Sequence, residues 1–371
     1  MGTRVGMMTF LHNNNYGSIL QAWSLQRAVT ALGYEAVFLD YAPSAGAKLR
    51  NLLDCRNSPS LLADGLRKRL LRRRESGARA RAEGFAAFRR ERLTLSPRCA
   101  DTSALAAESR ACDVLLCGSD QIWSPVWLNP AYFLDFAGTQ PKVCYAPSLG
   151  VSVLKDQAKR RRMTALLKDF ERLSVREADG AALLRELTGR TAEVLPDPVF
   201  LTQREDWLRL AQLPEKRHYL LAYFIGERPD YWERVRAAAE RERLDVVVIP
   251  VTAEAYAQPW QPADGLSPEA WLGWFAGAEA VVTDSFHGAA FSYLFGLTPE
   301  VLRRYREDDP ASKNSRIDQL LRHMTTAEGE TADDRLRALR ERGMAYLSEA
   351  LAEASSKAAS SGGSGDSKVS G

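Results

Sequence analysis

The chain has 371 residues, of which 45% are hydrophobic and 26% charged, and its formal net charge is +3. An ordinary domain needs roughly 100 to 200 residues, so two domains are expected, and the composition excludes a globally disordered protein. The longest apolar stretches, at 220–226 and 246–251, are much shorter than the roughly 20 residues that span a bilayer. We expect no transmembrane helix and no secretion signal.

Five cysteines are few for this length, and they show no Cys-x-x-Cys pair and no accompanying histidine. The expectation is therefore reduced, mostly buried thiols in a cytoplasmic protein, with no metal site built from them. The five are Cys55, Cys99, Cys112, Cys117 and Cys144.

The net charge hides an asymmetry along the chain. Residues 67–92 hold 11 Lys or Arg against 3 Glu, a net charge of +8, which leaves −5 for the rest. We expect a helix there, interrupted at Gly77 and Gly84 and lying on the outside of its domain. Such a segment is either a solvated face or a surface that attracts an anionic membrane. It lacks the interleaved aromatic residues of a nucleic-acid groove, so no nucleic-acid partner is expected.

Short β-rich segments alternate with amphipathic helical ones, which is the pattern of parallel sheets covered by helices. The first unit has a strand at 4–9, a helix at 18–32 and a strand at 36–39. Further strands are expected at 114–117, 142–145, 173–175, 192–195, 219–225, 245–250 and 280–283. Further helices are expected at 158–167, 178–187, 230–243 and 269–275, with another beginning near Ser285.

A Pro-Asp-Pro break at 196–198 marks the expected domain boundary. The prediction is thus an N-terminal Rossmann-like domain over residues 1–196 and a C-terminal one over residues 197–354. The Ser- and Gly-rich residues 355–371 are expected to form a flexible tail.

Three polar loops follow expected strands, at 12–17, 118–123 and 283–288. Ligands of open α/β sheets bind at such carboxyl ends of strands, so these loops are the candidate binding segments. A carboxylate and several amides facing one site suit a sugar, whose hydroxyls both donate and accept hydrogen bonds. The same residues also suit plain turns and helix caps, and both readings stay open.

Within 283–288 the expected strand ends in Asp284-Ser285, and His287 lies in the first turn of the following helix, which is rich in small residues. Free amides and a positive dipole end there can bind an anion. Alternatively, Ser285 only caps the helix and His287 only satisfies a buried hydrogen bond. Arg176 and Arg316 lie at a strand end and a helix start, where a guanidinium can hold a carboxylate or phosphate with two hydrogen bonds; a surface charge is the alternative for each.

Taken in order, the motifs resemble those of the polysaccharide pyruvyl transferase family, over roughly residues 5–321. The resemblance rests on Asn15-Tyr16-Gly17-Ser18 with Leu20-Gln21-Ala22, Gly118-Ser119-Asp120-Gln121-Ile122-Trp123, Ser174-Val175-Arg176-Glu177, Asp197-Pro198, Thr283-Asp284-Ser285-Phe286-His287-Gly288, and Asn314-Ser315-Arg316.

The resemblance implies two Rossmann-like domains facing across a cleft, as in GT-B glycosyltransferases. It also implies that phosphoenolpyruvate, as co-substrate and without a cofactor or metal, gives a pyruvyl group to two saccharide hydroxyls as a cyclic ketal. The roles that follow are catalytic for His287 and Asp120, donor-binding for Arg176, Ser285, Ser315 and Arg316, and acceptor-binding for Asn15, Tyr16, Gly17 and Gln121.

Family members usually carry Arg two positions before the motif His, where this chain has Ser285. A GT-B-like glycosyltransferase using a nucleotide sugar, or a non-catalytic saccharide-binding protein of the same fold, are the alternatives. The expected partner is a saccharide acceptor, lipid-linked acceptors included. The expected location is the cytoplasm, with peripheral contact at the inner membrane face through residues 67–92.

Overall fold

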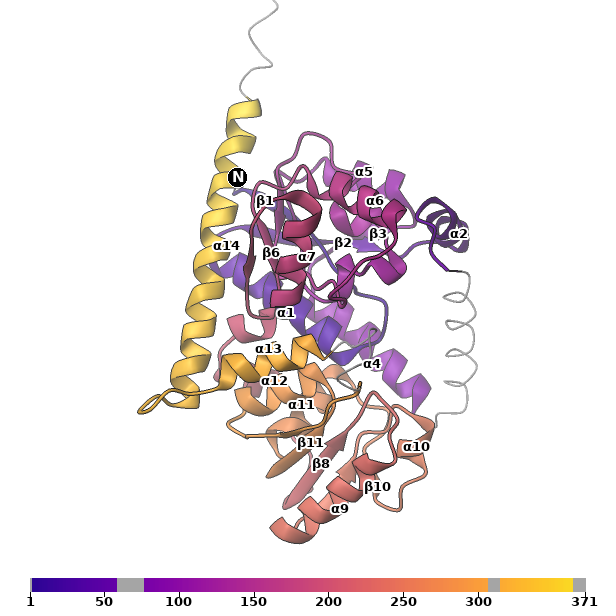
Figure 1. Cartoon of the computed structure of the whole chain (residues 1–371), viewed down its shortest axis with the longest axis vertical. Helices are drawn as coiled ribbons and strands as arrows, with labels where there is room; N and C mark the ends of the chain where they lie inside the picture. Colours follow the sequence, from indigo (N-terminus) through magenta and orange to yellow (C-terminus); the bar gives the residue numbers. More distant parts are fainter. Residues whose placement is uncertain (1, 59–76, 306–313, 363–371) are drawn as a thin grey trace, which may run out of the picture.

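The computed structural model of the chain describes residues 2–58, 77–305 and 314–362, and Figure 1 shows their arrangement. Two five-stranded sheets, with all recorded pairings parallel, carry helices packed against them. Their strand orders are β3-β2-β1-β4-β5 and β10-β9-β8-β11-β12, and β6 and β7 form a separate two-stranded sheet. This topology confirms the expected α/β fold with two Rossmann-like parallel sheets.

The central strands of the first sheet are largely apolar segments with side chains buried on both faces, as is typical of parallel sheets. Its strands are β1 (Arg4–Met8), β2 (Glu35–Tyr41), β3 (Leu95–Cys99), β4 (Val114–Cys117) and β5 (Lys142–Cys144). The separate two-stranded sheet consists of β6 (Leu173–Val175) and β7 (Ala192–Val194). The helices of this part are α1 (Tyr16–Ala31), α2 (Ala45–Asp54), α4 (Ala78–Arg92), α5 (Thr102–Ser109), α6 (Gln157–Leu167) and α7 (Ala178–Thr188), with the 3₁₀ turns η1 (Gln121–Trp123), η2 (Pro125–Trp127) and η3 (Pro130–Phe133).

The second sheet repeats the pattern with shorter edge strands. Its strands are β8 (Tyr219–Tyr223), β9 (Asp245–Val248), β10 (Gln261–Pro262), β11 (Ala280–Thr283) and β12 (Glu300–Val301). The other elements after residue 197 are η4 (Pro198–Leu201), α8 (Arg204–Leu210), α9 (Asp230–Glu242), α10 (Ala253–Tyr256), α11 (Pro268–Ala276), α12 (Phe286–Leu294), α13 (Ser315–Met324) and α14 (Ala332–Gly362).

Aromatic side chains join the two sheets into one apolar core around α1. Tyr16 stacks on Trp271 of α11 with ring centroids 5.3 Å apart, and Trp23 meets Trp207 of α8 at 4.9 Å. Residues of both sheets belong to the same buried cluster. The N-terminal end of α1 is therefore held at the junction of the two domains.

The basic helix α4 differs from expectation, because it does not simply lie on the outside. Phe85 and Phe88 are buried in the shared core. Gly84 lies against Ser267 so closely that an added Cβ would be 2.9 Å from its Cα, and Arg92 pairs with Glu269 of α11 at 3.4 Å. Apolar positions within the charge run therefore dock α4 between the domains. Residues 67–76 of the expected basic segment lie outside the described residues.

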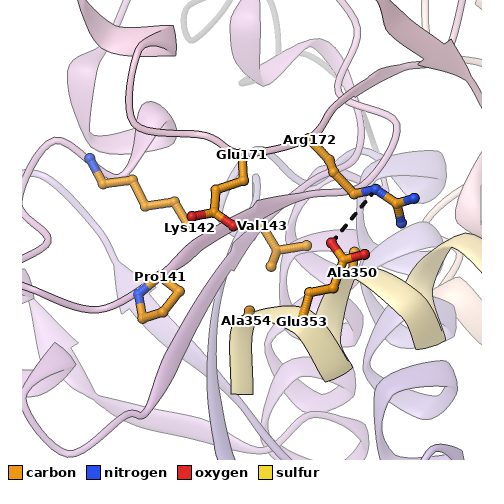
Figure 2. Close-up of a pocket in the computed structure, with 8 residues that line it drawn as sticks. All are labelled: Pro141, Lys142, Val143, Glu171, Arg172, Ala350, Glu353 and Ala354. Carbon is orange, nitrogen blue, oxygen red and sulfur yellow. Dashed lines mark ion pairs between the residues drawn. The ribbon is translucent and has the colours of Figure 1, made fainter. Parts of the chain in front are cut away.

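The last helix, α14, runs back along the first domain (Figure 1). Figure 2 shows it beside β5, where Arg172 pairs with Glu353 at 3.7 Å next to a cavity of about 20 Å³. The expectation of a flexible tail from Ser355 is wrong for residues 355–362, which continue the helix. Residues 363–371 lie outside the described residues, and the domain division at residue 197 stays a prediction.

Candidate active site

The loops after β1 and β4 meet because these strands are neighbours in the first sheet. Asn15 caps α1, its side chain accepting a hydrogen bond from the Ser18 amide at 3.1 Å. The Ser18 hydroxyl donates to one carboxylate oxygen of Asp120, and the other oxygen of Asp120 accepts the Gln121 amide at 2.8 Å. Asn15 and Gln121, predicted to bind the acceptor, and Asp120, predicted to be catalytic, thus belong to one polar edge of the first sheet.

The loop after β11 brings His287 to the same place from the second domain. Ser285 caps α12, with its hydroxyl oxygen accepting the Gly288 amide at 3.2 Å, which puts His287 in the first turn. His287 is 8% exposed, and its ring lies against Gly17 at the start of α1. Two of the residues singled out in the sequence, 270 positions apart, are therefore in contact across the domain junction.

Arg176 lies at the centre of this region, after β6, and is 2% exposed. One terminal nitrogen of its guanidinium, Nη1, donates to Asp197, and the other, Nη2, lies 3.9 Å from Asp120. The carboxylates of Asp197 and Asp120 outweigh the effect of burial and raise the pKa of Arg176. Its guanidinium carbon also lies 4.6 Å from the ring centroid of Phe286, a cation–π distance.

Asp197 joins this arginine to the histidine. The Nε2 atom of His287 lies 3.5 Å from the same carboxylate oxygen that Arg176 binds, and the other oxygen accepts the Val199 amide at 3.1 Å. Burial by itself raises the pKa of Asp197, but His287 and Arg176 outweigh it and lower that pKa to about 2. Asp197 is therefore ionised at neutral pH.

A second arginine enters from α13. With its amide oxygen turned toward Arg316, Gln121 accepts hydrogen bonds from both terminal guanidinium nitrogens, at 2.5 and 2.7 Å. Burial, together with the nearby positive charge of Arg176, lowers the pKa of Arg316 to about 10. Ser315 is the first residue of α13 and is half-buried beside it.

Glu177 is a member of this cluster that the sequence analysis did not single out as a site residue. Its Oε1 accepts hydrogen bonds from the Ser148 hydroxyl at 2.9 Å and from the amides of Leu149 and Gly150 at 2.9 and 3.2 Å. Its Oε2 is buried and has no hydrogen-bond partner within the described residues. A carboxylate held so firmly by one oxygen presents the other in a fixed place.

Buried polar atoms without a hydrogen-bond partner concentrate here, in the part of the chain that the structure describes. They are Nε and Nη2 of Arg176, Oε2 of Glu177, Nε2 of His287 and Nε of Arg316. Native proteins leave few such atoms unsatisfied, because each costs free energy. His287 Nε2 lies 3.5 Å from Asp197. The donors and acceptors of the other atoms match a ligand that carries both anionic groups and hydroxyls.

The structure brings together most of the residues predicted for the site, with two qualifications. Tyr16 faces the aromatic core, and its hydroxyl donates to the Leu266 carbonyl at 3.1 Å. Ser285 uses its hydroxyl oxygen to cap α12. Its neighbour Asp284 accepts the amides of Ile225 and Gly226 at 2.7 and 2.8 Å. The individual roles in donor and acceptor binding stay predictions.

The sequence places Asp197 in a Pro-Asp-Pro break between domains and in the Asp197-Pro198 motif, and neither observation gives it a role in the site. Its flanking prolines correctly indicate a turn of the chain. They give no indication that the carboxylate contacts Arg176 and His287. For Glu177 the available signal was its place directly after Arg176 at the end of a strand.

Within the described ranges, no group of three or more His, Cys, Asp or Glu is arranged to hold a metal. No helix in those ranges has the length and apolar character needed to span a bilayer.

Comparison with known proteins identifies a protein family that this chain matches. A family model described as polysaccharide pyruvyl transferase matches residues 15–297. A search of curated proteins finds no significant match.

Solved structures with a similar course of the chain are distant in sequence. MnaA from S. aureus, in a structure with UDP, is 11% identical, with 94% of this chain and 91% of that one covered and a TM-score of 0.46. A UDP-GlcNAc 2-epimerase from Neisseria meningitidis is 10% identical, with 96% and 94% covered and a TM-score of 0.46. The glycosyltransferase SnogD from Streptomyces nogalater is 13% identical, with 97% and 98% covered and a TM-score of 0.37.

Proposed function

Because the chain belongs to the polysaccharide pyruvyl transferase family, we propose that it transfers a pyruvyl group from phosphoenolpyruvate to two hydroxyls of a saccharide, as a cyclic ketal, in the synthesis of a cell-surface polysaccharide. The observation that carries the proposal is the cluster formed across the domain junction by Arg176, Arg316 and His287. It combines two guanidinium groups and an imidazole with buried polar atoms that have no hydrogen-bond partner among the described residues.

The donor carries a carboxylate and a phosphate, so its site needs positive charge and several hydrogen-bond donors. Arg176 and Arg316 supply both, and three of their buried nitrogens have no hydrogen-bond partner within the described part of the chain. A guanidinium can bind either anion through two parallel hydrogen bonds. Neither a metal nor a cofactor is part of the proposal.

The chemistry begins with a proton. His287, protonated, gives it to the methylene carbon of the donor, which becomes a methyl group, and C2 becomes electron-poor. A first saccharide hydroxyl adds to C2 and loses its proton. The bond from C2 to the phosphate oxygen then breaks, phosphate leaves with the electron pair, and a second hydroxyl closes the ketal as its proton departs. An imidazole suits the first step because histidine is the side chain most often used as a general acid in enzymes.

Asp120 is the proposed residue that orients or deprotonates the acceptor hydroxyl. Its carboxylate lies beside the start of α1 and 3.9 Å from Arg176, so acceptor and donor groups would meet at one place. Asn15, Tyr16, Gly17 and Gln121 remain the proposed acceptor side. Lipid-linked saccharides are included as acceptors. Membrane contact through residues 67–92, of which 67–76 lie outside the described residues, remains a proposal.

The test is incubation of the purified chain with phosphoenolpyruvate and a panel of free, nucleotide-activated and lipid-linked saccharides. We expect phosphate release only when an acceptor is present, and an acidic ketal product by mass spectrometry. Release of UDP or GDP from nucleotide sugars, without consumption of phosphoenolpyruvate, would instead identify a glycosyltransferase. Saccharide binding with neither reaction would identify a non-catalytic protein.

A further inference from the structure

Asp197 occupies an unusual position between the two domains. It follows the last strand before the second domain and caps the short turn η4, and its carboxylate is fully buried. One carboxylate oxygen contacts both Arg176 of the first domain and His287 of the second. The chain segment that connects the domains therefore contributes the group that holds the two together at the candidate site.

Cap geometry alone does not account for this arrangement. The capping bond to the Val199 amide uses Oδ1, whereas the contacts with Arg176 and His287 use Oδ2. A residue needed only as a cap has no use for a second, fully buried negative oxygen between a guanidinium and an imidazole. An ionised carboxylate beside an imidazole favours the charged form of the ring and fixes which nitrogen faces it.

We propose that Asp197 is a positioning residue for His287, holding the imidazole by Nε2 and favouring the protonated ring that gives its proton to the donor. The inference rests on the proposed function. Nδ1 is then the nitrogen left to release the proton; in this structure it lies against Gly17, so the donor reaches it only when the domain junction opens.

The other groups around the ring act in both directions. Arg176 shares the Asp197 oxygen and opposes a second positive charge, while Asp120 lies on the other side of Arg176, 3.9 Å from it, and reduces that opposition. On the α1 side the ring meets Gly17, which carries no charge. Within this set, Asp197 is the anion in direct contact with the imidazole.

The first test compares the pH dependence of kcat and of KM for phosphoenolpyruvate in the wild type, Asp197→Asn and Asp197→Glu. We expect Asp197→Asn to lower kcat by about 100-fold, within the range that loss of general acid catalysis produces. The alkaline limb of the profile should move to lower pH, because the variant lacks the carboxylate that contacts the ring at Nε2. Asp197→Glu, which keeps the charge, should retain the wild-type limb.

Two controls separate this role from others. Arg176→Lys shows what disturbance of the arginine alone does; if Asp197→Asn merely reproduces its rise in KM, with the alkaline limb unmoved, the proposal is overturned. Asp206→Asn removes a carboxylate that pairs with Arg27 at 3.2 Å on the surface and should leave the profile unchanged.

A second measurement needs neither substrate nor a stable variant at residue 197. The chain has four histidines, so labelled imidazole signals can be assigned with His287→Gln as reference. We expect the neutral ring of His287 in the wild type to carry its proton on Nε2. A proton on Nδ1 would overturn the proposal even if Asp197→Asn failed to fold. If the Nε2 form is found but no pyruvyl transfer occurs, the proposed function fails and the pairing stands.

Discussion

Gly17 and His287 touch across the junction of the two domains so closely that a side chain on Gly17 has no room. A Cβ placed on Gly17 would lie 1.9 Å from Nδ1 of His287 and 2.2 Å from its Cγ, far inside van der Waals contact. Glycine at this position is therefore a requirement of packing and not of backbone conformation. The contact ties the first turn of α1 to the first turn of α12.

Gly17→Ala should disrupt the junction by forcing the ring or the domain away. We expect a cost of about 1–3 kcal/mol in the free energy of unfolding, as for overpacked cores, and a strong loss of transfer activity. The matched control is Gly46→Ala in α2, where an added Cβ meets nothing within 4 Å. Urea unfolding and phosphate release measure the two effects. Equal stability and activity in both variants would contradict the closeness of the contact.

His287→Ala should remove the proton donor while the fold persists. Loss of general acid catalysis costs roughly 10²- to 10⁴-fold in rate, so we expect kcat to fall by that amount. Thermal unfolding should show a shift of only a few degrees. His218→Ala, at an exposed histidine that pairs with Glu279 at 3.2 Å, serves as control. Wild-type turnover in His287→Ala would remove the residue from the mechanism.

Arg176→Lys and Arg316→Lys should each weaken binding of phosphoenolpyruvate. An ammonium group keeps the charge but cannot form the paired hydrogen bonds of a guanidinium, so an increase of about tenfold or more in Kd is expected. Isothermal calorimetry without acceptor measures this directly. Arg228→Lys, at an exposed residue paired with Asp230, should bind as the wild type does. Unchanged affinity in both site variants would place the donor elsewhere.

Glu177→Gln tests the buried carboxylate whose Oε2 has no hydrogen-bond partner among the described residues. The amide replaces an acceptor oxygen by a donor, so hydroxyl groups of a saccharide would lose a partner, at a cost of about 1–3 kcal/mol. We expect a higher KM for the acceptor with little change in the affinity for phosphoenolpyruvate. A matched change, Glu186→Gln, affects a carboxylate half exposed on α7 and should be neutral. If only donor affinity changes, Glu177 belongs to the donor side.

Because of Asp197, the free energy of unfolding should decrease as the pH falls into the acidic range. Its folded pKa of about 2 lies below the ordinary value of 3.8, so the stabilisation is present above about pH 4 and is lost as the pH falls toward 2. The expected loss is about 2 kcal/mol. Urea unfolding between pH 7 and pH 2.5 measures it by comparison with Asp197→Asn, whose curve should be flatter. Parallel curves would show that the carboxylate is not stabilised by its neighbours.

Central strands and the helices beside them follow from the sequence because local pattern decides them. Val114–Cys117 and Ala280–Thr283, for example, are short apolar runs with the bounds expected. The edge strand β3 was missed because Pro97 lies in it, and proline is tolerated only where one side of a strand lacks a partner. The end of α14 was missed because serines and alanines at 355–362 look like a linker, whereas its preceding turns pack Leu347 and Leu351 into the core.

The candidate site divides in the same way. Loops at strand ends could be located from the sequence, since parallel sheets gather those ends at one edge. Pairings through space could not be predicted, because nothing local to Asp197 indicates that Arg176 and His287 converge on it. Long-range charge pairs are set by how the two domains dock, and that docking depends on the aromatic core around α1.

The return of α14 to the first domain has a mechanical consequence. The chain passes between the domains twice, once at the Pro196–Thr202 segment and again between α13 and α14. A body attached at two separate points can swing about the line through them but resists twisting or sliding. Any opening that admits a saccharide to the buried cluster should therefore be a rotation of one domain about the axis through these two connections. Asp197 lies beside one of them.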